Sequence, residues 1–215
     1  MSNHMAAGRD PRPDRQDQVR TGYDRIAEDY LASKSALDPE AEDLLSELLE
    51  GSAPDAPVLD LGCGAGVPVT QWLAERRQVL GVDLSRRQLA LCRRYVPSAW
   101  LLQADLTDLA LRDASCGSVV SMYAIIHVPR EEHRSLLERV YRWLLPGGAF
   151  LATWPMNEWE GEEQDWFGWG ATMWWSHFGR DANLAMLEST GFKIERAVDR
   201  HGDESWCWVL ARKPA

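Results

Sequence analysis

Residues 58–66 read VLDLGCGAG, an apolar run followed at once by a glycine-rich turn. The run from Val58 to Leu61 predicts a short buried strand, and a helix is expected to follow over residues 68–76. Glycines in the turn let the backbone approach a ligand closely, because no Cβ intervenes. The free N–H groups at the start of the helix can bind a carboxylate. This stretch therefore predicts a strand–turn–helix unit that binds a ligand.

The spacing of the glycines separates two kinds of nucleotide site. Dinucleotide-binding folds prefer the pattern GxGxxG. Glycines stand here at positions 62, 64 and 66, so the third comes one residue early, and Val67 occupies the expected place. This spacing disfavours a nicotinamide-dependent dehydrogenase.

Two helices are predicted before this turn, and strands and helices alternate after it. Further strands are predicted over residues 78–83, 99–103, 118–123 and 149–153, and helices from residue 21 and over residues 38–49, 85–95 and 130–145. The alternation predicts an α/β fold with a doubly wound, mostly parallel sheet and helices on both faces. Ligands of such sheets lie beyond the carboxyl ends of the strands.

Length and composition suit one domain without a nucleic-acid or membrane partner. Residues 1–20 are polar and charged and are predicted to be a disordered leader, and residues 21–215 a single domain. The leader lacks the apolar stretch of a signal peptide, and no segment approaches the roughly 20 apolar residues of a membrane helix. The net charge of −10, with no Lys/Arg-rich run, argues against a nucleic-acid substrate. We therefore expect a cytoplasmic protein, a monomer or weak homodimer.

The cysteines give no sign of a metal site. Cys63, Cys92, Cys116 and Cys207 are scattered, and no two have CxxC spacing. Reduced thiols of a cytosolic protein are the expected state.

Two acidic residues follow the next two predicted strands. Asp83 ends the strand at 78–83, where a carboxylate can accept both hydrogen bonds of a ribose diol. Asp105 follows the strand at 99–103, where a carboxylate can accept a hydrogen bond from an adenine amino group. Either acid alone is also typical of a helix cap or a solvated loop. The glycine turn and both acids, in order after three successive strands, favour a nucleoside site.

With this ordered set the chain resembles class I S-adenosylmethionine-dependent methyltransferases, in particular the small-molecule group called methyltransferase type 11 or type 12. The resemblance covers residues 23–148 well and the remainder loosely. It implies a Rossmann-like sheet of seven strands, the last antiparallel, with strands six and seven near residues 192–198 and 207–212. It also implies S-adenosylmethionine as cofactor, S-adenosylhomocysteine as product, and an O or N atom of a small molecule as methyl acceptor.

The resemblance further implies roles for individual residues. The methionine moiety and the ribose would be held by Asp60, Gly62, Gly64 and Gly66, the ribose hydroxyls by Asp83, and the adenine by Leu84, Asp105 and Leu106. Met122 and Tyr123 would lie beside the cofactor, Tyr123 also meeting the acceptor, and Tyr23 and Tyr30 would close over the cofactor from an N-terminal helix.

Methyl transfer is an in-line displacement, so alignment of nucleophile, methyl and sulfur matters most and can supply roughly 7–11 kcal/mol. A hydroxyl acceptor also gains from a general base. His127, just past the fourth strand, is the first candidate, and His177 the second. The alternative for His127 is a structural histidine hydrogen-bonded to backbone.

Residues 154–180 are predicted to form a lid over the acceptor. The segment is rich in aromatic and acidic residues, and a connection of this length is either functional or disordered. Acceptor contacts are expected from Trp154, Trp166, Met173 and Trp174 in an aromatic, partly acidic pocket. The alternative is that these tryptophans pack the lid onto the core.

Other functions remain open for such a fold. An S-adenosylmethionine-binding enzyme can catalyse a cyclisation or rearrangement without methyl transfer, and a non-catalytic binding partner can keep the pocket. A macromolecular acceptor is a further alternative. The Asn/Asp-Pro-Pro-aromatic motif of amino-directed nucleic-acid methyltransferases is absent, since residues 121–124 read SMYA.

Overall fold

The computed structural model of the protein describes residues 15–34, 36–202 and 205–215. Its elements, in chain order, are α1 (Arg15–Ala32), α2 (Pro39–Leu49), β1 (Val58–Leu61), α3 (Val69–Ala74), β2 (Val79–Asp83), α4 (Arg86–Tyr95), β3 (Trp100–Gln103), β4 (Cys116–Ser121), the 3-10 turn η1 (Ile125–His127), α5 (Arg130–Trp143), β5 (Leu144–Pro155), β6 (Trp159–Glu163), the 3-10 turn η2 (Trp166–Gly168), β7 (Met173–His177), α6 (Arg180–Thr190), β8 (Lys193–Arg200) and β9 (Trp206–Arg212).

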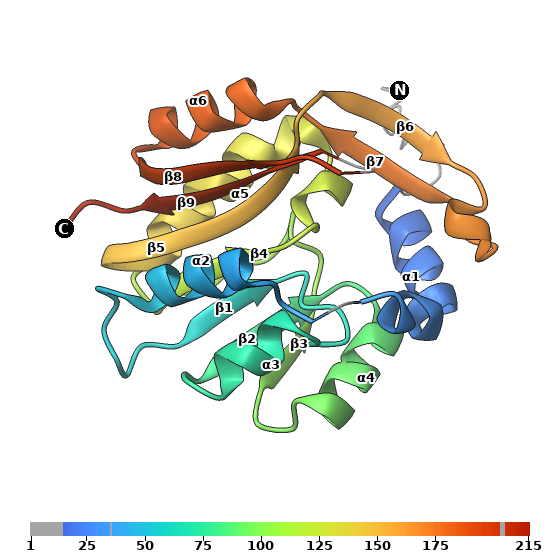
Figure 1. Ribbon diagram of the computed structural model, residues 1–215, viewed down its shortest axis with the longest axis horizontal. Coiled ribbons are helices and arrows are strands. Elements are labelled where there is room, and N and C mark those ends of the chain that lie inside the picture. Colours follow the sequence, from blue (N-terminus) through green and yellow to red (C-terminus); the bar gives the residue numbers. More distant parts are fainter. Residues whose placement is uncertain (1–14, 35, 203–204) are drawn as a thin grey trace, which may run out of the picture.

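Seven of the strands form one central sheet in the order β3-β2-β1-β4-β5-β9-β8. The strands from β3 to β5 are parallel, and β9 runs antiparallel to both β5 and β8. Figure 1 shows the sheet between its helices, with α1 across the end of the sheet that faces away from the C-terminus. The predicted doubly wound, mostly parallel sheet with an antiparallel last strand is confirmed.

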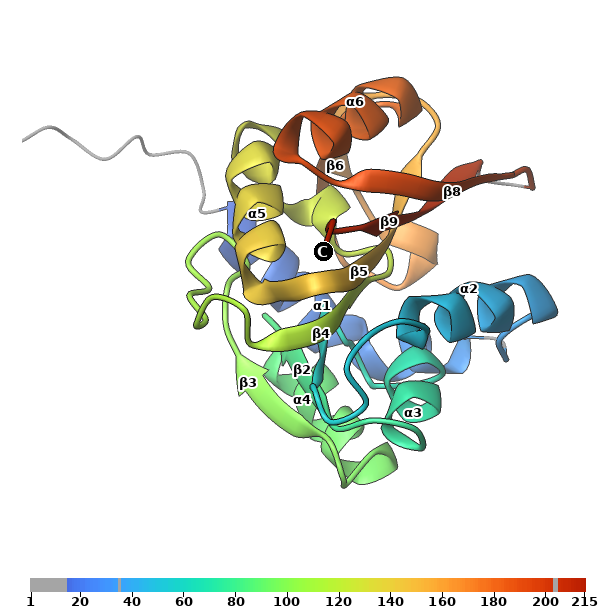
Figure 2. The ribbon, with the colours of Figure 1, turned by 90° about the vertical axis from the view of Figure 1, so that its left-hand side faces the viewer.

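Alternation along the strands divides the core between the two faces of the sheet. One face is covered by α5 and α6, whose buried residues pack on Leu59, Val119 and Phe150. On the other face α2 and α3 pack on Val58, Val120 and other intervening residues of the same strands. Figure 2 looks along the sheet and shows these two helical layers on opposite sides of it. Because both faces are covered, the carboxyl ends of the strands are the free edge for a ligand.

The first helix begins earlier than predicted. Residues 15–20, expected in the leader, are the first residues of α1, while residues 1–14 lie outside the described residues. Val19 and Ile26 are buried on one side of this helix. The buried face of α1 thus includes residues before and after Thr21 in the chain, which explains why the helix does not begin at Thr21.

Residues 154–180, the predicted lid, contain an antiparallel hairpin of β6 and β7. The hairpin is a separate two-stranded sheet that lies against α1 and η1. In Figure 1 it spans the upper right of the molecule, above α1. Within the described part of the chain, no helix combines the length and the apolarity needed to cross a bilayer.

Candidate functional site

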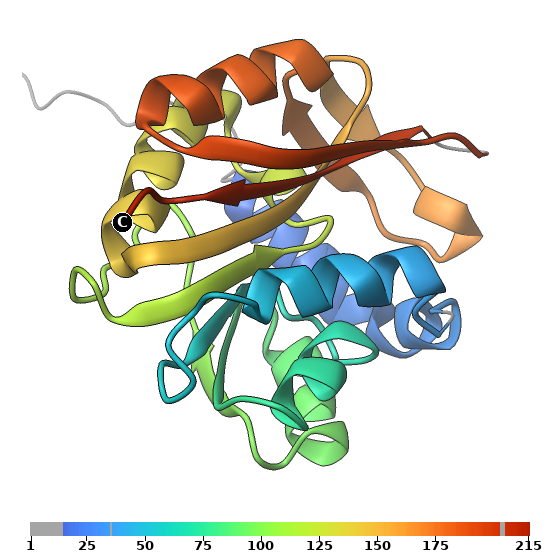
Figure 3. The ribbon, with the colours of Figure 1, turned by 60° about the vertical axis from the view of Figure 1, so that its left-hand side comes forward.

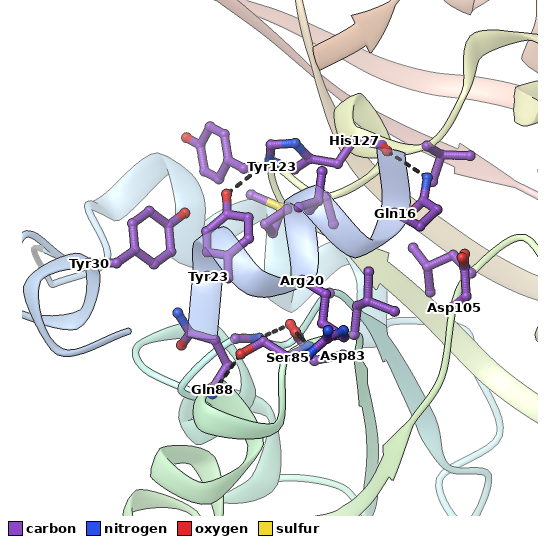
Figure 4. Close-up of a pocket in the computed structure, with 18 residues that line it drawn as sticks. Gln16, Arg20, Tyr23, Tyr30, Asp83, Ser85, Gln88, Asp105, Tyr123 and His127 are labelled. Atoms are coloured by element: carbon purple, nitrogen blue, oxygen red, sulfur yellow. Dashed lines mark hydrogen bonds between the residues drawn. The ribbon is translucent and has the colours of Figure 1, made fainter. Parts of the chain in front are cut away.

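A cavity lies beyond the carboxyl ends of the parallel strands, under α1. It contains about 650 Å³ of empty space, part of it open to solvent, and it is lined by the glycine turn, the ends of β2 and β4, and the loop after β3. Predicted site residues on its wall are Tyr23, Tyr30, Gly62, Gly64, Asp83, Leu84, Asp105, Leu106, Met122, Tyr123 and His127. Figure 4 shows α1 above this cavity, with Asp83 and Ser85 below and Asp105 to one side.

The Asp83 carboxylate is held at the end of β2 by two backbone N–H groups. Gly64 donates to Oδ2 and Ser85 to Oδ1, each over 2.8 Å. Burial raises the pKa of Asp83 to about 6, although these hydrogen bonds act against the rise. Each oxygen keeps a lone pair for a further donor, so the pair can accept the two hydroxyls of a ribose.

Gly62, Gly64 and Gly66 have different structural roles in the turn. A Cβ at Gly62 would lie 2.1 Å from the Cβ of Ala124, so glycine is needed for the loop after β4 to approach. A Cβ at Gly64 would meet only Gln88 Oε1, at 3.7 Å, which leaves its cavity side open. Gly66 is not among the residues that line the two cavities, and a Cβ there would collide with Cys92 Sγ at 2.6 Å. The packing of the turn on α4 therefore requires glycine at position 66.

Asp60 is buried at the end of β1 and accepts a hydrogen bond of 2.7 Å from the Thr70 hydroxyl. Burial raises its pKa to about 7. Asp60 lies on the wall of a second, larger cavity and not on that of the first.

Asp105 is both a cap and a wall residue. Its Oδ1 accepts a hydrogen bond from the backbone N–H of Thr107, over 2.8 Å, while the residue lines the first cavity beside Leu106. The two interpretations offered by the sequence are thus compatible at this position.

Gln88 is a wall residue that the sequence did not point to. Its side chain is 1% exposed, and neither its amide nitrogen nor its amide oxygen has a hydrogen-bond partner among the described residues. Buried polar groups are nearly always paired. An unpaired amide on a cavity wall is an observation that favours a polar ligand there. Position 88 in a helix carries no sequence signal that would have revealed this.

Tyr23 and His127 form a hydrogen-bonded pair on the roof of the cavity, drawn as a dashed line in Figure 4. The Tyr23 hydroxyl lies 2.9 Å from His127 Nε2, and His127 Nδ1 lies 2.8 Å from the carbonyl oxygen of Trp174. A carbonyl oxygen only accepts, so Nδ1 carries the proton, Nε2 accepts, and the Tyr23 hydroxyl donates. Burial lowers the pKa of His127 to about 4, so the imidazole is neutral.

Asp24 fixes the position of α1 over the cavity. Its Oδ1 accepts hydrogen bonds from the Ser85 hydroxyl, over 2.6 Å, and from the backbone N–H of Arg87, over 3.0 Å. Because Tyr23 is the adjacent residue, the contact of α1 with the start of α4 also sets the place of the Tyr23 ring.

The second cavity adjoins the first and contains about 1610 Å³ of empty space, part of it open to solvent. The two cavities share Tyr23, Tyr30, Gly62, Gly64, Met122 and Tyr123. Beyond the glycine turn, the second cavity is lined by the link between α1 and α2, by η2, and by the ends of β8 and β9. Figure 3 shows these segments at the same side of the molecule.

Of the predicted acceptor contacts, the structure brings Tyr123 and Trp166 to this second cavity. Trp154, Met173 and Trp174 are buried elsewhere: Trp154 in the core between the sheet and α5, Met173 against Gly22 of α1, and Trp174 beneath the Arg15 guanidinium. Trp175, the next residue of β7, lines the cavity instead. Strand alternation explains why neighbours on β7 differ, which a count of aromatic residues does not reveal.

His177 lines neither cavity. It is buried at the end of β7 near Trp159, with ring centroids 6.5 Å apart, and burial lowers its pKa. The acidic residues of the segment also lie away from the cavity, and Glu160 pairs with Arg15 and Arg130. Among the residues 154–180, the cavity wall is thus aromatic and not acidic.

Comparison with known proteins finds a family match over the central part of the chain. Residues 58–148 match the profile of the family described as "Methyltransferase domain". Over 139 residues the chain is 34% identical to methyltransferase GfsG of Streptomyces halstedii. The matched region covers 58% of this chain and 49% of GfsG. The chain spans about half or less of the length of most of the curated relatives it matches.

Solved structures share the fold over nearly the whole chain. The DhpI complex with S-adenosylhomocysteine superposes with a TM-score of 0.71 at 20% identity, covering 93% of this chain and 97% of that one. The cyclase SpnF superposes with a TM-score of 0.70 at 18% identity, covering 94% and 97%. At these identities the likeness concerns the fold alone.

Proposed function

Residues 58–148 belong to the methyltransferase domain family, and on this premise we propose that the protein transfers a methyl group from S-adenosylmethionine to an O or N atom of a small molecule. The observation that carries the proposal is the first cavity. It joins the Asp83 carboxylate, the open side of Gly64 and the unpaired Gln88 amide beside a second cavity of aromatic walls.

The residues of the first cavity fit the cofactor. The Asp83 oxygens suit the ribose hydroxyls, and Leu84 and Leu106 supply apolar walls for the adenine next to Asp105. Met122 and the glycine turn lie where both cavities meet, which suits the reacting sulfur. When bound, S-adenosylmethionine supplies an electrophilic methyl group on a sulfonium. The neutral thioether left behind is a good leaving group, so the chain mainly has to align the acceptor.

For His127 the geometry favours positioning over proton transfer. Both ring nitrogens are engaged, and a pKa lowered to about 4 makes the imidazole a weak base near neutral pH. We therefore assign His127 to hold the Tyr23 hydroxyl over the cavity. His177, which lines neither cavity, is not part of this proposal.

The test is transfer of label from methyl-tritiated S-adenosylmethionine into a pool of small metabolites, followed by chromatography. A labelled product that depends on Asp83 is the expected result. Binding of the cofactor without label transfer would instead favour a cyclase, a rearrangement enzyme or a non-catalytic partner. Label in nucleic acid or protein only would overturn the small-molecule acceptor.

A further inference from the structure

The second cavity carries charge as well as aromatic walls. Beyond the glycine turn, its charged wall residues on the side of α2 and β8 are Lys34, Asp38 and Arg200. Arg200 pairs with Asp38, lies 3.8 Å from Glu40, and stacks at 4.6 Å over the Trp208 ring. The charges of the Arg200 guanidinium and the Asp38 carboxylate therefore balance each other in an ion pair.

Lys34 differs from Arg200. Its Nζ lies 3.7 Å from the centroid of the Tyr30 ring and 5.6 Å from that of Tyr123. Within the described residues, no carboxylate comes within salt-bridge distance of this ammonium, whose contacts are these two aromatic faces. Lysine is a strongly hydrated point charge, so an ammonium held on a cavity wall is available to an anion that enters.

Tyr123, which lines both cavities, has a strained backbone conformation. Its φ is +59°, a left-handed value that is uncommon for a bulky residue, and its N–H donates to the buried Thr153 hydroxyl over 2.7 Å. Its ring meets that of Trp206 edge to face, with centroids 4.7 Å apart. Backbone strain of this kind is found where surrounding structure enforces it, often at ligand sites.

The position of Lys34, Tyr123 and Trp206 relative to the sheet indicates that they would contact the acceptor and not the cofactor. Asp83 and Asp105 follow β2 and β3, on one side of the glycine turn after β1. Trp206 belongs to β9, which lies on the opposite side of β1, beyond β4 and β5. An in-line displacement places the acceptor on the far side of the methyl group from the sulfur, which suits the side of β5 and β9.

We propose that the acceptor is a flat, conjugated small molecule that carries a carboxylate, and that Lys34 binds this carboxylate while Tyr30, Tyr123 and Trp206 pack against the ring system. This inference rests on the proposed function, since it assigns the second cavity to the acceptor. Aromatic faces bury such rings, and an ammonium beside them selects an anion over a neutral or cationic analogue.

The test uses calorimetry on the full chain with S-adenosylhomocysteine at saturation. The probes are planar carboxylates of one, two and three fused rings, such as 4-hydroxybenzoate and 6-hydroxy-2-naphthoate, each paired with its carboxamide. We expect at least one carboxylate to bind about tenfold more tightly than its carboxamide. Lys34→Met should abolish this difference, Lys34→Arg should keep it, and Lys193→Met, on the exposed face of β8, should behave as wild type.

Two outcomes would overturn the inference. One is that no carboxylate of the set binds more tightly than its carboxamide, or that Lys34→Met keeps the preference. The other is that Lys34→Met weakens S-adenosylhomocysteine itself about tenfold, which would assign the ammonium to the methionine carboxylate of the cofactor. Failure of wild type to bind S-adenosylhomocysteine at all would instead count against the proposed function, so the two are distinguished in the same titrations.

Discussion

At the scale of single residues, the buried Gln88 amide should lower the stability of the free protein and strengthen the binding of the cofactor. A buried polar group without a partner costs about 1–3 kcal/mol. We expect Gln88→Met, which keeps the volume and removes the amide, to raise the free energy of unfolding by about 1 kcal/mol and to weaken S-adenosylhomocysteine binding by about 1 kcal/mol. Urea unfolding and calorimetry measure the two effects. A variant that is less stable and binds normally would show that the amide has another partner.

The Tyr23–His127 pair gives a second prediction at this scale. Tyr23→Phe keeps the ring but loses the hydrogen bond to His127 that holds it over the cavity, so cofactor affinity should fall by about 0.5–1.5 kcal/mol, the range of one neutral hydrogen bond. His127→Gln, whose amide can engage the same two partners, should retain much of the turnover that His127→Ala loses. A positioning role also predicts no inflection of turnover near pH 6.5, because burial holds the pKa of His127 near 4. Such an inflection, lost in His127→Gln, would restore the role of general base.

Site residues could be predicted from the sequence where an acidic residue directly follows a predicted strand. Asp83 and Asp105 line the first cavity because each directly follows a parallel strand. Gln88 and Lys34 could not be found in this way. Their significance lies in the lack of a hydrogen-bond or ion-pair partner among the described residues, and no spacing in the chain encodes that.

At the scale of elements, the hairpin of β6 and β7 is tied to two helices through Glu160. Its carboxylate pairs with Arg15 of α1 and Arg130 of α5 and accepts a hydrogen bond of 3.3 Å from Ser176 of β7. We expect Glu160→Gln to loosen the hairpin, seen as faster amide hydrogen exchange over residues 159–177. Glu162→Gln, on the exposed part of the same strand, is the matched control.

A lid also has to respond to ligand. Exchange over residues 159–177 should slow when S-adenosylhomocysteine is bound, because Trp166 and Trp175 line the cavity next to Tyr23 and Tyr30. Equal exchange in the free and bound protein would show that the hairpin is a rigid part of the domain.

The sheet was predictable from sequence and the hairpin was not. The strands β1, β2 and β4 are apolar runs bounded by turn residues, which is the pattern of buried parallel strands. The strand β6 reads WEGEE and is largely exposed, so no periodicity marks it. It is a strand because it pairs with β7, and β7 is held by α1 and η1. Tertiary contacts of this kind override local propensity.

At the scale of the whole molecule, the buried carboxylates link the ligand site to the dependence of stability on pH. Burial raises the pKa of Asp60 to about 7, so the folded protein holds a proton that the unfolded chain releases near pH 4. Its contribution to stability is therefore present below about pH 4 and is lost as the pH rises through about 7. His127 and His133, whose pKa values burial lowers to about 4, act in the opposite direction below pH 6.5.

Because these groups oppose one another, the comparison with a variant is sharper than the profile of wild type. Asp60→Asn removes one titration and keeps an acceptor for the Thr70 hydroxyl. The stability of Asp60→Asn relative to wild type should rise by about 2.5–3 kcal/mol between pH 5 and pH 8, because wild type loses about 1.4 kcal/mol per pH unit between pH 5 and the Asp60 pKa of about 7. Urea unfolding at both pH values measures this difference. A difference independent of pH would mean that Asp60 is ionised throughout.

Calorimetric titration with S-adenosylhomocysteine tests the central claim, that the cavity under α1 holds this cofactor. Wild type should bind with a dissociation constant in the micromolar range, about −7 to −8 kcal/mol. Asp83→Ala should bind more weakly by about 1.5–3 kcal/mol, the range for hydrogen bonds to a charged group, without unfolding. The account is contradicted if wild type gives no heat with S-adenosylmethionine or S-adenosylhomocysteine and instead binds a nicotinamide dinucleotide.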